Sequence, residues 1–215
     1  MNERVKILIG EVQHLDKNIR AEAALGLGKT HDPAATVVLL QALRSETDPF
    51  VQENLTWAIV RMGPSAIEPL LEMLHDPDPA VRHHVVHTLG KIKDPHTLSA
   101  LVDMLQDADM VVKSKAVFAL GQLGDRAAIP ALVACLGQGD RLFQETLNTV
   151  LENFGEPTLA VLIQALAHAH GPVREQAADI LEMMDDPAAI QPLRQLLIFK
   201  IIENLAGFIR EAQSK

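Results

Sequence analysis

A stretch of about thirty-one residues recurs six times along this chain. One column of apolar residues advances in steps of 32, 30, 31, 31 and 30 residues and consists of Ile19, Val51, Val81, Val112, Phe143 and Val173. Eight residues later stands a second column, which consists of Leu27, Ile59, Leu89, Leu120, Leu151 and Leu181. A third column consists of Leu43, Leu74, Leu105, Leu136, Leu166 and Leu197. Such a period is typical of a solenoid, whose units bury their apolar faces only by stacking on a neighbour.

Each copy of the repeat is predicted to form two helices. The first, called helix B here, begins at an aspartate that can accept hydrogen bonds from the free amides of the first turn. These aspartates lie three residues before the first column: Asp16, Asp48, Asp78, Asp109 and Asp140. The second, helix A, begins at acidic–proline pairs such as Asp32-Pro33 and Asp94-Pro95. Because the connections are too short for strands, we expect an all-α fold, an α-α superhelix of about six to seven helix pairs.

The helix-B segments resemble a known repeat. Val81-Arg82 through Leu89-Gly90, and Val112-Lys113 through Leu120-Gly121 and Leu123-Gly124-Asp125, are similar to the short HEAT-like repeat named after phycobilisome lyases. The resemblance covers roughly residues 15–197 and implies a HEAT-like solenoid. It also implies one candidate function, that of a phycobilin lyase subunit or a related chromophore-handling protein. The same repeat serves many roles, so function has to be argued from the residues that do not repeat.

We expect one continuous array over residues 1–215. Residues 1–14 would form an N-terminal capping helix, residues 15–197 the six repeats, and residues 198–215 a C-terminal helix. That last segment carries an apolar stripe of Ile198, Ile201, Ile202, Leu205, Phe208 and Ile209. Two alternatives stay open: the segment bends back and caps the last core, or its stripe is a homodimer contact.

Composition excludes several classes of function. A net charge of −9 disfavours binding to nucleic acid, because it repels phosphate backbones. The single cysteine, Cys135, excludes an internal disulfide. The N-terminus lacks a signal-peptide core and no apolar run is long enough to span a membrane, so we expect a cytoplasmic protein. No catalytic or phosphate-binding motif is present, so we expect a non-enzymatic protein without a cofactor.

The residues six positions after the first column point away from the core stripe of helix B. Three successive copies place large rings there, namely Trp57, His87 and Phe118. They are flanked by polar and charged residues: Glu53, Arg61, His83, His84 and Lys115. Because helix B lines the concave side of such solenoids, we expect a groove that binds a partner protein or peptide. The alternative is that the rings fill gaps between neighbouring B helices.

Two further expectations concern charged and metal-binding side chains. His83 and His87 lie four residues apart on one helix face, and Glu53 could add a carboxylate, so metal binding is a second alternative function. One helical histidine pair is short of the three or four ligands that a durable site needs, and a solvated or partner-facing histidine set explains the same pattern. A basic column follows the first apolar column by one residue and is predicted to pair with the acidic caps of adjacent units: Arg20, Arg82, Lys113 and Arg174.

Overall fold

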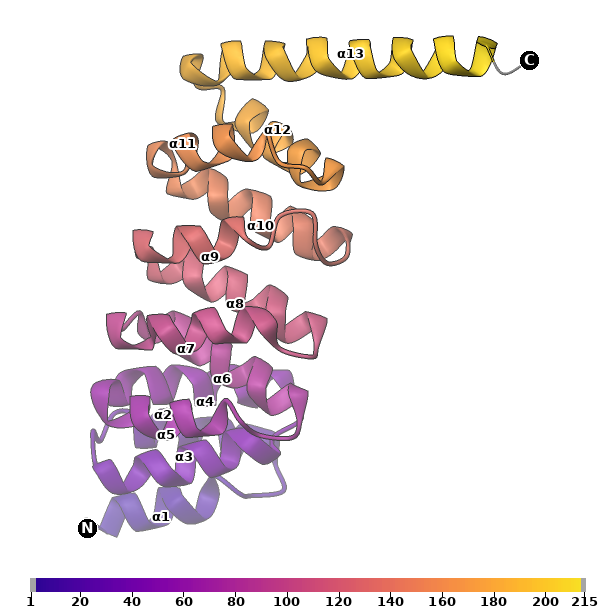
Figure 1. The fold of residues 1–215 in the computed structure, drawn as a ribbon. Helices are drawn as coiled ribbons and strands as arrows, with labels where there is room; N and C mark the ends of the chain where they lie inside the picture. Colours follow the sequence, from indigo (N-terminus) through magenta and orange to yellow (C-terminus); the bar gives the residue numbers. More distant parts are fainter. Residues whose placement is uncertain (1–2, 214–215) are drawn as a thin grey trace. The chain divides into compact units, whose positions relative to one another are not determined.

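The computed structural model describes the backbone of residues 3–213 and the side chains of residues 3–201. Every regular element in this part of the chain is a helix, so the all-α prediction is confirmed (Figure 1). The chain divides into two compact units, Met1–Asp125 and Arg126–Lys215. Each unit is described by itself below.

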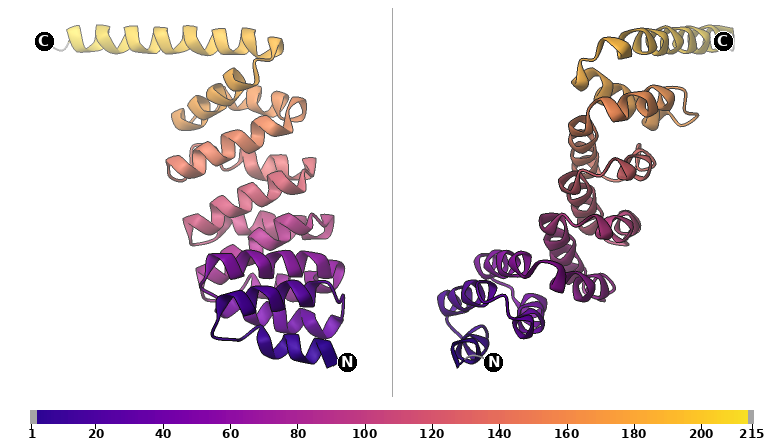
Figure 2. Two further views of the ribbon diagram at one scale, coloured as in Figure 1. Left: turned by 180° about the vertical axis from the view of Figure 1, so that it is seen from behind. Right: turned by 90° about the vertical axis from the view of Figure 1, so that its left-hand side faces the viewer.

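The first unit alternates the two predicted kinds of helix. Helix B of the first four copies is α2 (Lys17–Gly28), α4 (Pro49–Met62), α6 (Pro79–Ile92) and α8 (Met110–Leu123). The other layer consists of α1 (Glu3–Glu11), α3 (Pro33–Ser45), α5 (Ile67–Met73) and α7 (Leu98–Asp103), with the short 3-10 turns η1 (Gly63–Ala66), η2 (Pro95–Thr97) and η3 (Met104–Gln106). The B helices pack side by side in chain order, and each contacts the helix of the other layer that precedes it (Figure 2).

The second unit continues the same alternation. Its B helices are α10 (Arg141–Phe154) and α12 (Gly171–Met184), which pack on each other. The remaining elements are η4 (Arg126–Ala128), α9 (Ile129–Val133), α11 (Glu156–Ala165), η5 (Pro187–Ala189) and α13 (Ile190–Gln213). Helix α9 contacts both α10 and α11, and α11 contacts α12, so this unit also has two helical layers.

The helix starts follow the predicted capping chemistry. The side chain of Asp48, for example, accepts hydrogen bonds from the amides of Phe50 and Val51, at 2.9 and 3.4 Å. Helix α12 departs from the rule, because its N-cap is His170 and makes no side-chain cap bond. The sequence shows the cause, since no aspartate precedes Val173 by three residues. Equivalent aspartates cap the other B helices as far as α10: Asp16, Asp78, Asp109 and Asp140.

The three repeating columns form most of the core. All six residues of the second column are buried, with exposed fractions of at most 1%. The first column is buried in four copies and half-buried at Ile19 and Val173. The third column is buried in five copies, but Leu197 is 60% exposed, which differs from the expected pattern. Leu196 is buried in its place, because α13 presents a different face to the rest of the unit.

The C-terminal segment of the chain belongs to one long helix, α13. It runs without interruption over Ile190–Gln213, a length of about 36 Å at 1.5 Å per residue. The described backbone therefore does not bend back, since no turn interrupts the helix within its bounds, and whether the segment caps the last core stays a prediction. The physical reason lies in the sequence, because no Asp, Gly or Pro follows Leu197 within five residues, whereas one does in each earlier copy. The side chains of four stripe residues lie outside the described part: Ile202, Leu205, Phe208 and Ile209.

Glycines set the spacing between the B helices of the first unit. A Cβ on Gly28 would lie 2.7 Å from the Cα of Ala58, and one on Gly90 would lie 2.8 Å from the Cβ of Ala119. Helices α2 and α4, and likewise α6 and α8, therefore approach each other closely and pack extensively. Between α4 and α6, Val60 occupies the position that corresponds to these glycines, and the packing there is less extensive. The B layer of this unit consists of two tight pairs.

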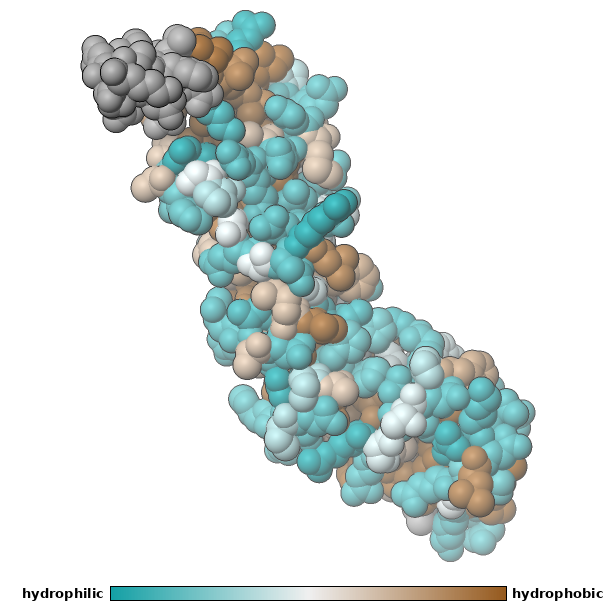
Figure 3. All heavy atoms as spheres, turned by 90° about the vertical axis from the view of Figure 1, so that its right-hand side faces the viewer, coloured by the Kyte–Doolittle hydropathy of each residue, from teal (hydrophilic) through white to brown (hydrophobic). Residues whose placement is uncertain are grey.

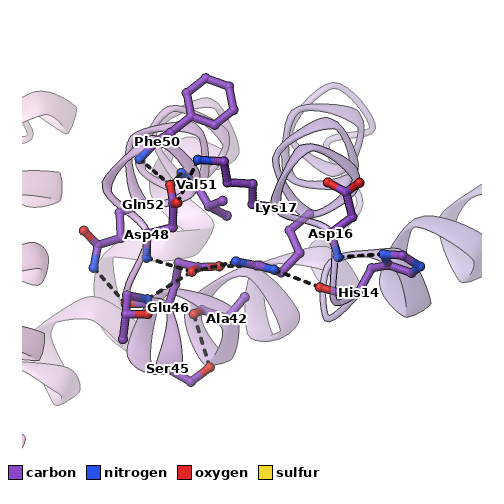
Figure 4. Close-up of polar contacts among 12 residues, drawn as sticks. His14, Asp16, Lys17, Ala42, Ser45, Glu46, Asp48, Phe50, Val51 and Gln52 are labelled. Carbon is purple, nitrogen blue, oxygen red and sulfur yellow. Dashed lines mark hydrogen bonds and ion pairs between the residues drawn. The ribbon is translucent and has the colours of Figure 1, made fainter.

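Two residues of the basic column, Arg20 and Arg82, pair with acids, but not with the helix caps that we expected. Arg20 donates from Nε and Nη2 to the carboxylate of Glu46, at 2.7 and 3.0 Å, and from Nη1 to two carbonyls of the loop before α2. Figure 4 labels Glu46 and the residues around it, including His14 and Asp48. Glu46 lies two residues before the cap Asp48, whose amide it accepts at 2.9 Å. The expected pairing of Arg20 was wrong because the oxygens of Asp48 are already occupied, one by amides of its own helix and the other by Lys17.

The same arrangement recurs two copies later. Arg82 donates from Nε and Nη2 to Asp107, both at 2.7 Å, and from Nη1 to the carbonyls of Asp76 and Pro77. Asp107 accepts the amide of the cap Asp109 at 2.8 Å. Each arginine thus joins the loop before its own helix to the acid that precedes the next B helix. We call this arrangement the arginine clamp.

Candidate functional site

One surface of the first unit gathers the expected site residues. Three B helices, α4, α6 and α8, place side chains on the face opposite the core stripe. We call this set the B-face cluster; it consists of Glu53, Trp57, Arg61, His83, His84, His87, Lys91, Lys115 and Phe118. Side chains four residues apart share a helix face, so the cluster residues of α4 form one row and those of α6 form the next.

The two hydrophobic rings of the cluster are exposed and each lies under a cation. Trp57 is 40% exposed, and the guanidinium carbon of Arg61 lies 4.9 Å from its ring centroid. Phe118 is 43% exposed, and Lys115 Nζ lies 5.5 Å from its ring centroid. A cation over an aromatic face is attractive by about 0.5–1 kcal/mol at exposed sites. Whether these rings bind a partner or fill gaps between neighbouring B helices stays a prediction, since more than half of each side chain is covered.

The third ring, His87, differs from the other two. Its side chain is 21% exposed, and its Nε2 lies 3.7 Å from Glu53 Oε2. Its Nδ1 is buried and has no hydrogen-bond partner among the described atoms. Glu53 also accepts from Lys91 Nζ at 2.5 Å, so this carboxylate joins α4 to α6. Lys91 lies four residues after His87 and therefore shares its helix face.

Burial and positive neighbours lower the pKa values of the three histidines of α6. Burial lowers the pKa of His83 to about 4, and the charge of Lys115 contributes in the same direction. Burial also lowers the pKa values of His84 and His87, again with Lys115 as the next cause. The pKa of Lys115 itself is lowered by burial. These effects indicate that Lys115 of α8 and the histidines of α6 share one environment, in which added positive charge is unfavourable.

The cluster offers poor ligands for a metal ion. Among the described residues, no group of three His, Cys, Asp or Glu side chains is placed to hold one. Glu53, the expected carboxylate ligand beside His83 and His87, pairs with Lys91 instead. The rings of His83 and His84 lie edge to face at 5.3 Å, which is a packing arrangement of aromatic rings. The cluster is therefore a surface of exposed rings and cations with one paired carboxylate.

Comparison with known families identifies the repeat. The family model for HEAT repeats matches residues 37–114, 67–146 and 101–167, which together span more than half of the chain. The model for the PBS lyase HEAT-like repeat matches residues 19–45 and 173–199. The chain belongs to the HEAT-repeat family, and the resemblance expected from its sequence is confirmed.

Solved structures show the same fold. The chain is similar to a structure of the complex of CpcE and CpcF of phycocyanin lyase from Nostoc sp. PCC7120, at 25% identity and a TM-score of 0.50, over 87% of this chain and 79% of that one. Importin beta matches with a TM-score of 0.56 at 16% identity, over 84% of this chain and 31% of that one. YibA of E. coli matches with a TM-score of 0.51 at 16% identity, over 91% and 76% of the two chains. The curated proteins contain no match.

Two further findings bear on the class of protein. HEAT-repeat solenoids present extended surfaces that bind other proteins, and this chain has a fold of that class. In the described part of the chain, no helix combines the length and the apolar character that crossing a bilayer requires.

Proposed function

We propose that this protein is a non-catalytic scaffold that binds a partner protein or peptide on the concave helix-B face, through the B-face cluster. The observation that carries the proposal is the pair of exposed rings, Trp57 and Phe118, each held under a cation on a face that the core does not use. Exposed aromatic and arginine side chains are enriched among the residues that contribute most to binding.

The charges of the cluster favour a particular kind of partner. Glu53 is paired with Lys91, whereas Arg61 and Lys115 form no ion pair among the described side chains. The cluster is therefore locally positive on a chain whose net charge is −9. A segment that combines an apolar side chain with aspartate or glutamate would cover the rings and neutralise these cations. We infer an acidic–apolar peptide segment as the ligand class.

The single tryptophan makes this proposal directly measurable. Trp57 is the only tryptophan of the chain, so its fluorescence reports on the cluster alone. Peptides selected from a random library against the wild-type protein should be enriched in acidic and apolar residues and should shift Trp57 emission to shorter wavelength. The variant Phe118→Ala should bind them at least about thirtyfold more weakly, the loss typical of a residue that dominates an interface.

Phe50→Ala is the matched control, because Phe50 is an aromatic of α4 outside the cluster and, at 54%, somewhat more exposed than Phe118 at 43%. It should leave both the emission shift and the affinity unchanged. The proposal fails if the selected peptides bind without changing Trp57 emission, or if Phe50→Ala weakens them as much as Phe118→Ala does. Melting curves of both variants show whether either ring supports the fold instead.

A second candidate function rests on the likeness to the phycocyanin lyase complex. That likeness extends over 87% of this chain, and the PBS lyase HEAT-like model matches at both ends of the repeat array. We propose, as the alternative, a role as a lyase-type subunit that handles a bilin chromophore. Titration of the purified chain with a bilin, followed by its visible absorption, tests this. Saturable binding with a shifted absorption band would support the alternative, and unchanged free-bilin absorption at equimolar protein would remove it.

A further inference from the structure

The arginine clamp is incomplete in the last copy of the repeat. Arg174 of α12 donates from Nη1 to the carbonyls of His168 and Ala169, both at 2.8 Å, as Arg20 does to His14 and Leu15. In the clamps of the first unit, Nε then donates to an acid. In this copy the Nε of Arg174 is buried and has no partner within the described part of the chain. One half of the clamp is present and its acid is missing.

The sequence explains why the acid is absent. Glu46 follows Arg20 by 26 residues and Asp107 follows Arg82 by 25, in each case where helix A has ended. The corresponding residues after Arg174 are Phe199 and Lys200. Both lie inside α13, which continues as helix at the point where the other A helices stop. Lys200 pairs with Glu175 of α12, at 3.3 Å, so a cation occupies a place where the earlier copies carry an acid.

A cavity lies where the acid would be. It has a volume of about 630 Å³ and is lined by Arg174, by residues of the α11–α12 connection and by one face of α13, including Leu166, His168, Leu196 and Phe199. The equivalent cavity in the first copy, of about 530 Å³, is lined by Arg20, His14, Ala42 and Glu46. The two cavities occupy the same place in the repeat, and the difference is that the first contains its own carboxylate.

The Arg174 cavity is lined by apolar side chains as well as by Arg174. Leu166 and Leu196 are nearly buried, and Phe199 is 50% exposed beside them. Four residues of α13 at helical spacing line this space: Pro192, Gln195, Leu196 and Phe199. Brown, hydrophobic atoms also gather at the C-terminal end of the described side chains in the space-filling view (Figure 3). A ligand that fills the cavity would satisfy Arg174 and cover these apolar side chains at the same time.

We propose that the Arg174 cavity is a binding site for an acidic side chain of another protein, presented two residues before the capping aspartate of a helix. That is the way in which this chain presents Glu46 and Asp107 to its own arginines. The bidentate geometry of a guanidinium and a carboxylate gives the site its selectivity. A second copy of this chain stacked head to tail does not fit, because the residue two positions before its first cap, Asp16, is His14. The partner is therefore a different chain.

A peptide taken from the chain itself tests the site. The probe is a fluorescently labelled nine-residue peptide with the sequence of residues 105–113, which carries Asp107 two residues before Asp109. Its anisotropy should rise and saturate with the full-length protein. A peptide with Asp107→Asn should bind about tenfold more weakly or worse, because a charge-assisted bidentate pair is lost. In the protein, Arg174→Gln should cause a similar loss.

Arg141→Gln is the matched control, because Arg141 is an arginine of the same unit whose side chain is 92% exposed and pairs with Glu145. It should bind the probe like the wild-type protein. On the wild-type protein and on Arg141→Gln, the unsubstituted peptide should bind more tightly than the Asp107→Asn peptide. On Arg174→Gln, the two peptides should bind with equal affinity. The proposal is overturned if Arg174→Gln leaves the affinity of the unsubstituted peptide unchanged, or if Asp107→Asn does not weaken it.

A second variant keeps the test decisive if Arg174→Gln fails to fold. Phe199→Glu places a carboxylate on the wall of the same cavity, where it can complete the clamp internally. It should raise the melting temperature relative to Phe199→Gln and should abolish probe binding. No difference between these two variants in either measurement would contradict the proposal. Competition with succinate identifies the source of the carboxylate: if succinate binds as tightly as the peptide, the site takes a free dicarboxylate and the assignment to a partner protein is wrong.

Discussion

Arg20 and Glu46 form a two-point ion pair across 26 residues of sequence, with Nε–Oε2 and Nη2–Oε1 distances of 2.7 and 3.0 Å. Their side chains are 19% and 7% exposed, and Glu46 also accepts the amides of Thr47 and Asp48. Burial alone would raise the pKa of Glu46, but the hydrogen bonds from Arg20 and from these amides lower it below its ordinary value. Through these hydrogen bonds and those of Arg20, the Glu46 carboxylate links the end of α3 and the start of α4 to the loop before α2.

Glu46→Gln should therefore destabilise the protein by about 1–3 kcal/mol, because the hydrogen bonds between the Arg20 guanidinium and a charged acceptor are lost. Urea unfolding followed by circular dichroism measures the change. Glu3→Gln is the control: Glu3 pairs with Lys6 at 3.3 Å on an exposed surface, and its loss should cost less than about 0.5 kcal/mol. Equal effects of the two substitutions would argue against a structural role for the clamp.

Gly28→Ala should destabilise by about 1–3 kcal/mol, since the new methyl group would lie 2.7 Å from the backbone of Ala58 and force α2 and α4 apart. Gly10→Ala is the matched change within a helix, because nothing lies within 4 Å of its Cβ position. It should stabilise by about 0.5–1 kcal/mol through helix propensity. Thermal unfolding of the two variants should shift in opposite directions, and parallel shifts would refute the close-packing account.

Acidification should weaken the first unit through its histidines. Burial lowers the folded-state pKa of His83 to about 4 from the ordinary value of 6.5, so the unfolded chain binds the proton first. The stability contributed by neutral His83 is complete above pH 6.5 and is lost as the pH falls from 6.5 towards about 4. The melting temperature should fall less steeply over this range in His83→Gln than in the wild type. Equal slopes in His83→Gln and the wild type would contradict this account.

The homodimer contact expected for the C-terminal helix remains a proposal. Ile198 and Ile201 are 57% and 50% exposed and are not among the α13 residues that line the Arg174 cavity. If α13 pairs with a second copy, Ile198→Lys with Ile201→Lys should convert a dimer into a monomer in multi-angle light scattering. A wild-type protein that is monomeric at high concentration would remove the proposal. The Arg174 peptide assay should be unaffected by this double substitution.

The sequence alone predicted the parts of the fold that depend on local chemistry. The second apolar column is buried in every copy, and the cap at Asp48 forms as expected, because both follow from spacing within one helix. The exposure of Trp57 and Phe118 was also anticipated from helical periodicity. These features need no knowledge of how distant helices meet.

The wrong or missing predictions concern contacts that depend on the packing of several helices and loops. The partners of Arg20 and Arg82 are acids outside the helices, which a comparison of helix positions does not reveal. His87 was expected on the surface with the other rings, yet the packing of α6 against its neighbours half-buries it. The unpaired Nε of Arg174 was missed, although Phe199 and Lys200 stand where the earlier clamps have their acids.

The alternation of glycine and valine at the B-helix contacts has a mechanical consequence for the first unit. In the α2–α4 and α6–α8 contacts the backbones approach closely and pack extensively, whereas the α4–α6 contact around Val60 is less extensively packed. When a load flexes this unit, displacement concentrates where the fewest interactions resist it. The less extensively packed α4–α6 contact lies between Trp57 and His87, and the Glu53–Lys91 ion pair joins the two helices there. Flexing would therefore change the spacing of the aromatic rings before it disturbs the hydrophobic core.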